Sequence, residues 1–223
     1  MKKITTVLLA AVLLFTTSAT AQNEKFTKRM TQLIAQMDTA RTPNQWQEVG
    51  TAFERVAETE KTQWLPFYYA ALSNCNQATM QLTNIEGGAT DITDPAADKA
   101  EALLTKALAL TKESSETLIV TKMIASLRMM GDPMSRFMQY GPIAAKALAT
   151  AKAMDVNNPR IYLLEAQDKF YTPEQFGGSK TAAKKLFTKA AELSKAFKPE
   201  TALHPNWGMG TINYFLNTQF KGN

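Results

Sequence analysis

One spacing of apolar residues recurs in four segments of the chain: a smaller residue, a large one four positions later, and a smaller one three positions after that. Because an α-helix turns once every 3.6 residues, all three positions lie on one helix face. The chain also holds 32 Ala and only 6 Val, which favours helices over strands. The four copies are Val49-Phe53-Val56, Ala100-Leu104-Ala107, Ala144-Leu148-Ala151 and Ala183-Phe187-Ala190. We therefore expect an all-α fold.

Capping residues and prolines predict where the helices begin. Polar residues precede proline at Thr42, Asp94 and Asn158, and Ser179 is a further capping residue. The predicted helices cover residues 24–40, 43–59, 64–82, 95–112, 115–130, 141–155, 159–171, 179–197 and about 206–219. Three long loops are then expected, at residues 83–94, 131–141 and 172–178.

The repeated spacing resembles the second helix of the tetratricopeptide repeat. The segment Met154-Asp155-Val156-Asn157-Asn158 stands where that helix usually ends in Leu-Asp-Pro-Asn-Asn. Tyr162 and Ala166 then fall at the large and the small position of the next first helix. The resemblance covers roughly residues 40–200, and it implies an antiparallel helix-pair solenoid.

The repeats are longer than those of the family they resemble. Their central residues, Phe53, Leu104, Leu148 and Phe187, are 51, 44 and 39 positions apart, whereas a standard repeat has about 34 residues. The junction from second helix to next first helix keeps a constant length, so the extra residues must form long loops inside each pair. Equivalent loops of a solenoid emerge along one edge, where we expect the binding surface.

Several strings are similar to those of short exported tetratricopeptide-like proteins of Bacteroidota, and they imply an envelope protein of helical-repeat fold. These strings begin at Trp64 (WLPFYYAA), Asp132 (DPMSRF), Tyr140 (YGP), Tyr171 (YTPEQFGG) and Leu203 (LHPNWG).

The amino end has the pattern of a secretory signal peptide at residues 1–21. Lys2 and Lys3 precede a short apolar run, and small residues then end in an A-x-A cleavage pattern. We expect cleavage after Ala21, a single helical-repeat domain at 22–223, and a periplasmic or secreted protein without a membrane span. Loss of both lysines lowers the net charge from +5 to +3.

The sequence lacks the motifs of the common enzyme and nucleic-acid-binding classes. His204 is the single histidine, so a multi-histidine metal centre is excluded within one chain. Residues 177–181 (GGSKT) depart from a phosphate-binding loop, and the lysines form no arginine-rich stripe. Cys75 has no disulfide partner in the chain. We therefore expect no catalytic residue, no cofactor, no metal and no nucleic-acid partner.

Aromatic side chains in the predicted loops, and in the groove that the first helices of the pairs would line, are the best candidates for a binding surface. Such side chains, together with arginine, dominate the energetics of protein interfaces. The candidate partner-binding residues are Trp64, Tyr68, Arg136, Phe137, Tyr140, Tyr162, Tyr171 and Phe176, with Met134 and Met138 beside them; Trp64, Tyr68 and Tyr162 fit the core equally well. The leading hypothesis is a non-enzymatic periplasmic scaffold that binds a peptide or a partner protein of the cell envelope.

Three alternatives to this scaffold stay open. A small-molecule-binding protein or a cryptic enzyme would have a pocket under the loops at 131–141 and 171–178, and would use His204, Asp168 or Glu174. The loop aromatics would instead cover the core if they fold back on it. A structural subunit of an envelope assembly would expose a large apolar patch.

Overall fold

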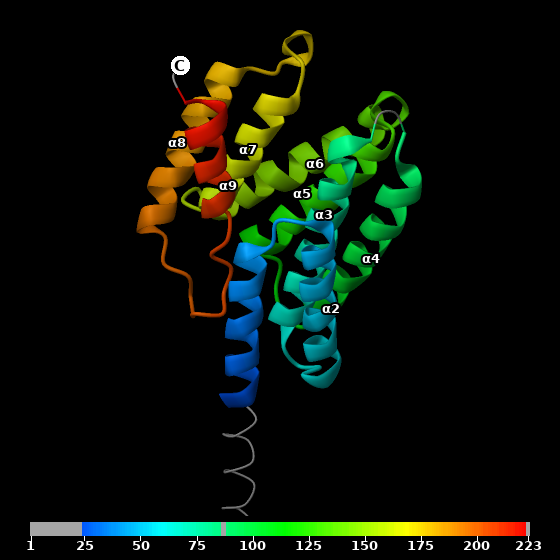
Figure 1. Cartoon of the computed structure of the whole chain (residues 1–223), viewed down its shortest axis with the longest axis vertical. Coiled ribbons are helices and arrows are strands. Elements are labelled where there is room, and N and C mark those ends of the chain that lie inside the picture. Colours follow the sequence, from blue (N-terminus) through cyan, green and yellow to red (C-terminus); the bar gives the residue numbers. More distant parts are fainter. Residues whose placement is uncertain (1–23, 86–87, 222–223) are drawn as a thin grey trace, which may run out of the picture.

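Helices form at the segments whose apolar residues recur every three or four positions (Figure 1). The computed structural model describes residues 24–85 and 88–221, in which no strand occurs and a first helix covers residues 24–39. The other helices are α2 (Pro43–Thr59), α3 (Trp64–Gln81), α4 (Thr90–Leu108), α5 (Ser115–Gly131), α6 (Pro133–Met154), α7 (Pro159–Tyr171), α8 (Lys180–Ala196) and α9 (Met209–Tyr214). Short helical turns follow as η1 (Leu82–Asn84), η2 (Glu174–Phe176) and η3 (Phe215–Gln219). The all-α prediction is confirmed.

The predicted signal peptide and its cleavage site lie outside the described residues. In the described part of the chain, no helix is both long enough and apolar enough to cross a membrane. Export therefore remains a prediction from the sequence.

Three of the predicted helix starts are confirmed by their caps. The Thr42 hydroxyl accepts the Gln45 N–H at 3.2 Å, while the Gln45 side chain accepts the Thr42 N–H at 3.1 Å, which forms the expected capping box. Asn158 accepts the Arg160 N–H at 3.1 Å. Ser179 begins α8 in the same way, by accepting the Ala182 N–H at 3.2 Å.

The predicted loop at 83–94 is shorter than expected, and the one at 131–141 is wrong, because helices extend into both. The helix expected from Pro95 begins at Thr90, and Pro95 lies inside α4. The expected loop at 131–141 is mostly the start of α6, since Asp132 caps that helix by accepting the Ser135 N–H at 3.3 Å. Asp132-Pro133 is thus a cap-and-proline start of the kind found elsewhere in the chain. Only residues 172–178 keep the expected loop, with η2 inside it.

The repeated apolar positions are the contact positions of their helices. The central residues Phe53, Leu104, Leu148 and Phe187 are all buried, and so are the alanines that flank the last three of them. Val49 is buried, whereas Val56 is only partly so. Small residues at these places let neighbouring helices approach closely, as the spacing predicts.

The buried side chains form two clusters that α5 connects. The first cluster packs the helix at 24–39 with α2, α3, α4 and part of α5, and the second packs the start of α5 with the end of α6 and with α7, α8 and α9. Met123 and Trp207 contact both clusters. In Figure 1, α7 to α9 accordingly form one group and α2 to α4 another, with α5 and α6 between them.

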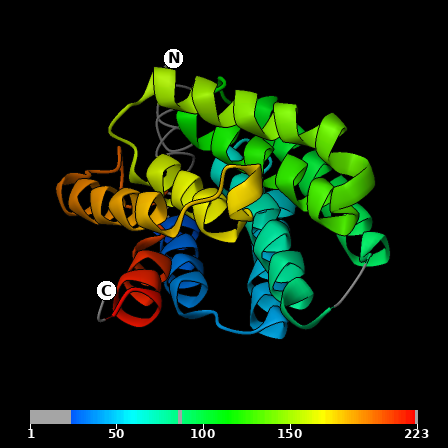
Figure 2. The ribbon, with the colours of Figure 1, turned by 90° about the horizontal axis from the view of Figure 1, so that it is seen from above.

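The regular solenoid implied by the tetratricopeptide resemblance is not confirmed. In such a solenoid, each second helix packs on the next first helix. Here α6 packs along α5 and barely contacts α7. Figure 2 shows α6 running beside α5 along one border of the molecule. The order of stacked pairs is therefore interrupted between α6 and α7.

A long connection after α8 returns to the first group of helices. We call residues 197–208 the C-terminal strap. The Tyr69 hydroxyl donates to the Leu203 carbonyl at 2.9 Å, and the Trp207 indole N–H donates to the Tyr68 hydroxyl at 2.9 Å. Gly208 ends the strap with φ of 111°, a conformation that favours glycine, and α9 begins at the next residue. The strap thereby links α3 to the carboxyl-terminal helices.

Candidate ligand-binding pocket

A cavity of about 630 Å³ lies where the starts of α3, α5 and α7 meet the end of α6 and the C-terminal strap. We call it the strap pocket. Its apolar lining comes from Trp64, Met154, Phe197, Pro199 and Pro205, and its ionisable lining comes from Glu113, Glu116, Asp155, Glu200 and His204. Pockets of roughly 300–1,000 Å³ with apolar walls and a few polar groups are typical of small-molecule sites.

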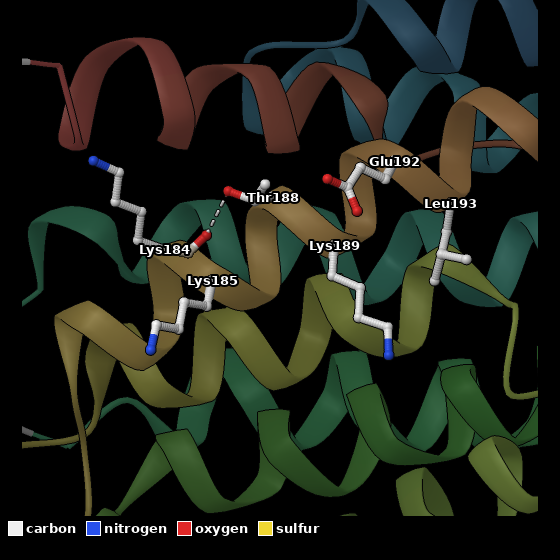
Figure 3. A pocket seen from close by; sticks show the side chains of 6 residues that line it. All are labelled: Lys184, Lys185, Thr188, Lys189, Glu192 and Leu193. Carbon is white, nitrogen blue, oxygen red and sulfur yellow. Dashed lines mark hydrogen bonds between the residues drawn. The ribbon is translucent and has the colours of Figure 1, made fainter.

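A second hollow of about 530 Å³ follows the outer face of α8. Its lining residues all belong to this one helix, and Figure 3 shows Lys185 and Lys189 projecting from the same side of it. The Thr188 hydroxyl donates to the Lys184 carbonyl at 3.0 Å (Figure 3). Since no second element converges on it, this hollow is a surface feature of a basic helix, and the strap pocket is the better candidate site.

Glu116, which lines the strap pocket, forms a buried ion pair with Arg160 behind the lining, and we call this pair the floor of the pocket. The Arg160 guanidinium donates through Nε to both carboxylate oxygens of Glu116, each at 3.0 Å, and the Arg160 side chain is 1% exposed. The Asn158 amide adds a hydrogen bond to Glu116 at 2.6 Å, and the Tyr68 hydroxyl adds another at 3.1 Å. Because these residues come from α3, α5 and the start of α7, the floor holds three helices in one arrangement.

Tyr68 acts in this floor as a neutral hydrogen-bonding group. Burial, reinforced by the neighbouring Glu116 carboxylate, raises the pKa of Tyr68 well above its ordinary value. The hydroxyl therefore stays protonated, so it can donate to Glu116 while it accepts from Trp207 of the strap. The strap is thus tied to the charged floor through one tyrosine.

The guanidinium of Arg160 also supports the aromatic wall. Its central carbon lies 4.5 Å from the ring centre of Phe197, which places a cation against an aromatic ring that lines the pocket. The Nη1 atom of Arg160 is buried and has no hydrogen-bond partner. The ion pair with Glu116 thus leaves one donor of this arginine unsatisfied.

His204 stands in the strap with both ring nitrogens in polar contacts. Its Nδ1 atom lies 2.8 Å from the Thr201 hydroxyl, and its Nε2 atom lies 3.3 Å from a carboxylate oxygen of Glu200. The ring meets Trp64 edge-on, with centroids 5.7 Å apart. Trp64 meets the Tyr68 ring in a similar way at 5.6 Å. The histidine and the tryptophan are therefore adjacent parts of one wall.

The opening of the strap pocket is acidic. Four carboxylates line the pocket, and only that of Glu116 is neutralised by a buried arginine. Glu200 is 81% exposed at its side chain. Lys112 and Lys198 adjoin lining residues in the sequence and are exposed.

Trp64 is the one predicted binding residue that lines the strap pocket. Tyr68 and Tyr162 are buried, which is the alternative that the sequence left open for them, and neither can present its ring to a partner. Burial arises from packing between helices that are far apart in the chain, and for this reason a local pattern did not separate core from surface for these tyrosines.

The aromatic residues that were predicted to line one edge of loops lie in two separate parts of the structure. Arg136 is engaged by Asp94 through both terminal nitrogens, at 2.5 and 2.9 Å, so it is not a free anchor. Phe137 lies on α6 and is 59% exposed, whereas Tyr171 and Phe176 stand at the end of α7 and in η2, at 69% and 74%. Tyr171 packs edge-on against Phe170 and Phe215.

An exposed apolar surface follows the first turns of α6. Met134 and Met138 are 94% and 81% exposed, and with Phe137 they occupy neighbouring positions of the helix. We call these three side chains the α6 patch. A groove of about 200 Å³ lies between α4, α5 and α6, where half-buried Tyr140 lines it together with Leu104 and Ile143.

The strap pocket does not lie beneath the loops at 131–141 and 171–178, where the small-molecule alternative would have a pocket. The strap pocket lies at the start of α5, the end of α6 and the start of α7, which are the opposite ends of these helices. Asp168, one of the carboxylates considered for it, is bound to the buried Lys122 at 2.6 Å. Among the described residues, no group of three or more His, Cys, Asp or Glu side chains is placed to hold a metal ion.

Trp64 and His204 are the pocket residues that the sequence indicated, and the other lining residues were not predicted. Glu116, Phe197 and Arg160 carry no local motif, and the pocket joins residues from Trp64 to Pro205. The turn at Leu203-His204-Pro205 was the one available signal, since it places a histidine in a rigid connection.

The chain has a structural relative among the solved structures. No family model matches the sequence, and no curated protein matches it. The chain is similar to the solved structure of the HusA haemophore from Porphyromonas gingivalis, with a TM-score of 0.73 and 28% sequence identity. The match covers 89% of this chain and 95% of that one. The two proteins therefore share their architecture over nearly their whole lengths.

Proposed function

We propose that the protein is an exported, non-enzymatic binding protein that takes up a flat, largely apolar ligand of the haem type in the strap pocket. One observation carries this proposal: in a chain similar to a haemophore, the single histidine lies in one pocket with Trp64, Phe197 and Met154. Imidazole and thioether groups are both ligands of haem iron, and aromatic faces suit a planar ring system.

The pocket agrees with such a ligand in size and in the chemistry of its walls. The volume of about 630 Å³ is that of a small-molecule site. Trp64 and Phe197 supply aromatic surface from two separate elements, α3 and the strap. The floor of Glu116 and Arg160 is already in place, so little side-chain ordering is needed on binding.

Glu113, Asp155 and Glu200 would repel the two carboxylate groups of a haem-type ligand at the acidic opening. The apolar part of the ring would lie against Trp64 and Phe197, and the carboxylates would extend past the opening into water. Binding in this orientation involves no covalent step.

Haem titration of the purified chain tests the proposal. We expect saturable binding of ferric haem, followed by absorbance near the Soret band. Trp64→Ala should weaken it by about tenfold or more, since one aromatic wall is lost. Phe137→Ala removes an aromatic side chain of the α6 patch, which lies outside the strap pocket, and should leave the haem affinity unchanged. Absence of saturable binding, or equal losses in the two variants, would contradict the proposal.

The α6 patch supports a second candidate, which is the binding of a partner protein of the cell envelope. Exposed Met and Phe side chains at neighbouring helix positions are typical of a protein-binding surface. Crosslinking in the cell envelope should capture partners with the wild-type chain and lose them with Phe137→Ala combined with Met138→Ala. Recovery of the same proteins by both forms would reject this candidate without affecting the pocket.

A further inference from the structure

We propose that His204 contacts the iron of the bound ligand through its Nε2 atom, and that Thr201 is the positioning residue that orients the ring. This inference rests on the proposed haem-type ligand. It adds which atom of the chain meets the iron and which neighbours control that contact.

The position of His204 in the strap makes the contact possible. The side chain lines the strap pocket and is 21% exposed, so its ring is held by the protein and still reaches the cavity. The backbone N–H of His204 donates to the Thr201 carbonyl at 3.0 Å, and the buried Pro205 follows directly. Together with the edge-on contact to Trp64, these features restrict the orientation of the imidazole.

Thr201 can select the form of the ring that binds a metal. With its proton on Nδ1, the imidazole donates to the Thr201 hydroxyl, whose oxygen lies 2.8 Å away. The same oxygen accepts the Leu203 N–H at 3.2 Å, so it already acts as an acceptor in this turn. In that form Nε2 carries a lone pair that can bind iron once the Glu200 carboxylate, 3.3 Å away, moves aside. Histidines that bind metals commonly donate their other N–H to a neighbouring acceptor in this way.

Glu200 competes for the nitrogen that the iron would use. Its carboxylate oxygen lies 3.3 Å from Nε2, where it occupies the position that the iron would take. The Glu200 side chain is 81% exposed, so it can turn into water when the ligand enters. Removal of this carboxylate should therefore strengthen the iron contact, whereas loss of the Thr201 hydroxyl should weaken it.

Cys75 and Met154 carry sulfur atoms that could also bind iron, but they are less suited to this role than His204. Cys75 is fully buried, and burial raises the pKa of its thiol to about 12, so it offers no thiolate at neutral pH. Met154 lines the same pocket but is 51% exposed at the end of α6, where no described contact orients its thioether. His204 is the group that neighbouring residues hold in a defined orientation.

Ferric haem and metal-free protoporphyrin IX separate iron ligation from ring binding. We expect the wild type to bind ferric haem about tenfold or more tightly than the metal-free ring. His204→Ala should abolish this preference, shift the Soret band, and leave the affinity for the metal-free ring within about twofold. Added imidazole should restore the Soret position of this variant. Electron paramagnetic resonance of the ferric complex should lose its imidazole-ligand signature in the variant.

Three further variants make the test specific. His204→Gln keeps a side chain that can hydrogen-bond Thr201 without an imidazole, and it should behave like His204→Ala. Thr201→Val should lower haem affinity by about tenfold without changing the metal-free affinity. Glu200→Gln should raise the preference for haem over the metal-free ring, a readout in which its repulsion of the carboxylates of both rings cancels. The circular dichroism spectrum and the urea midpoint of each variant serve as controls for folding.

The outcomes distinguish this inference from the function on which it rests. An unchanged Soret band and an unchanged preference for haem in both His204 variants would overturn the inference and leave the proposed function standing. If neither ring bound saturably to the wild type, the proposed function would fail, and the inference with it.

Discussion

At the residue scale, the buried Glu116–Arg160 pair is the group whose loss should cost the fold most. Arg160 is almost wholly buried, and Glu116 is its sole carboxylate partner in the described structure. Glu116→Ala should lower the free energy of unfolding by about 3–5 kcal/mol, since it leaves a buried charge unpaired. Urea denaturation measures the change. Glu200→Ala, which removes an exposed carboxylate of the same pocket, should stay within about 0.5 kcal/mol. Similar values for the two variants would contradict this account.

Cys75 gives a second prediction at the scale of one side chain. It is buried in the first core cluster, and desolvation raises the pKa of its thiol to about 12. Iodoacetamide at about pH 8 should therefore leave the native protein unlabelled and should label the protein in concentrated urea to one equivalent. Mass spectrometry of the two samples checks this. Rapid labelling of the native chain would show that α3 is not packed as described.

At the scale of the element, α8 depends on its cap at Ser179. The hydroxyl accepts the Ala182 N–H at 3.2 Å and satisfies a donor that the helix cannot pair internally. Ser179→Ala should reduce stability by about 1 kcal/mol, and Ser179→Asp should retain it, because aspartate caps equally well. Thermal unfolding followed by circular dichroism compares them. A loss of equal size in both variants would exclude capping as the cause.

At the scale of the whole molecule, Asp94 and Arg136 join the start of α4 to the start of α6. The Ala89 N–H donates a hydrogen bond to the Gly131 carbonyl at 2.8 Å, and this bond holds together the residues that precede the two helices. The Arg136 guanidinium donates to both carboxylate oxygens of Asp94 and lowers the pKa of that carboxyl group below its ordinary value. This ion pair therefore stabilises the folded state only while Asp94 is ionised.

The sign of the resulting pH dependence follows from the lowered pKa of Asp94. The stabilisation is complete above the ordinary carboxyl pKa of about 4 and is lost as the pH falls through the lowered value of the folded state. The urea midpoint of the wild type should therefore fall more steeply below about pH 4 than that of Asp94→Asn. Other carboxylates, including Asp132, titrate in both proteins and cancel in the comparison. Parallel curves would show that the pair contributes nothing to stability.

The helices and their contact faces could be predicted from the sequence because both depend on neighbours three or four positions apart. The caps at Thr42, Asn158 and Ser179 and the buried Phe187 show this directly. The start of α6 had the same local signal at Asp132-Pro133, but the helix was predicted to begin only at residue 141. Pro142 instead lies inside α6.

Tertiary structure alone decided which polar and aromatic residues form a site. Arg136 is paired by a carboxylate 42 positions away, and the strap pocket joins the beginning of α3 to a strap more than 130 residues later. No periodic pattern spans such separations, because hydrogen bonding along a helix is local, whereas a pocket depends on how whole helices pack. The sequence by itself thus determined an all-α chain with defined contact faces, and packing determined where that chain can bind.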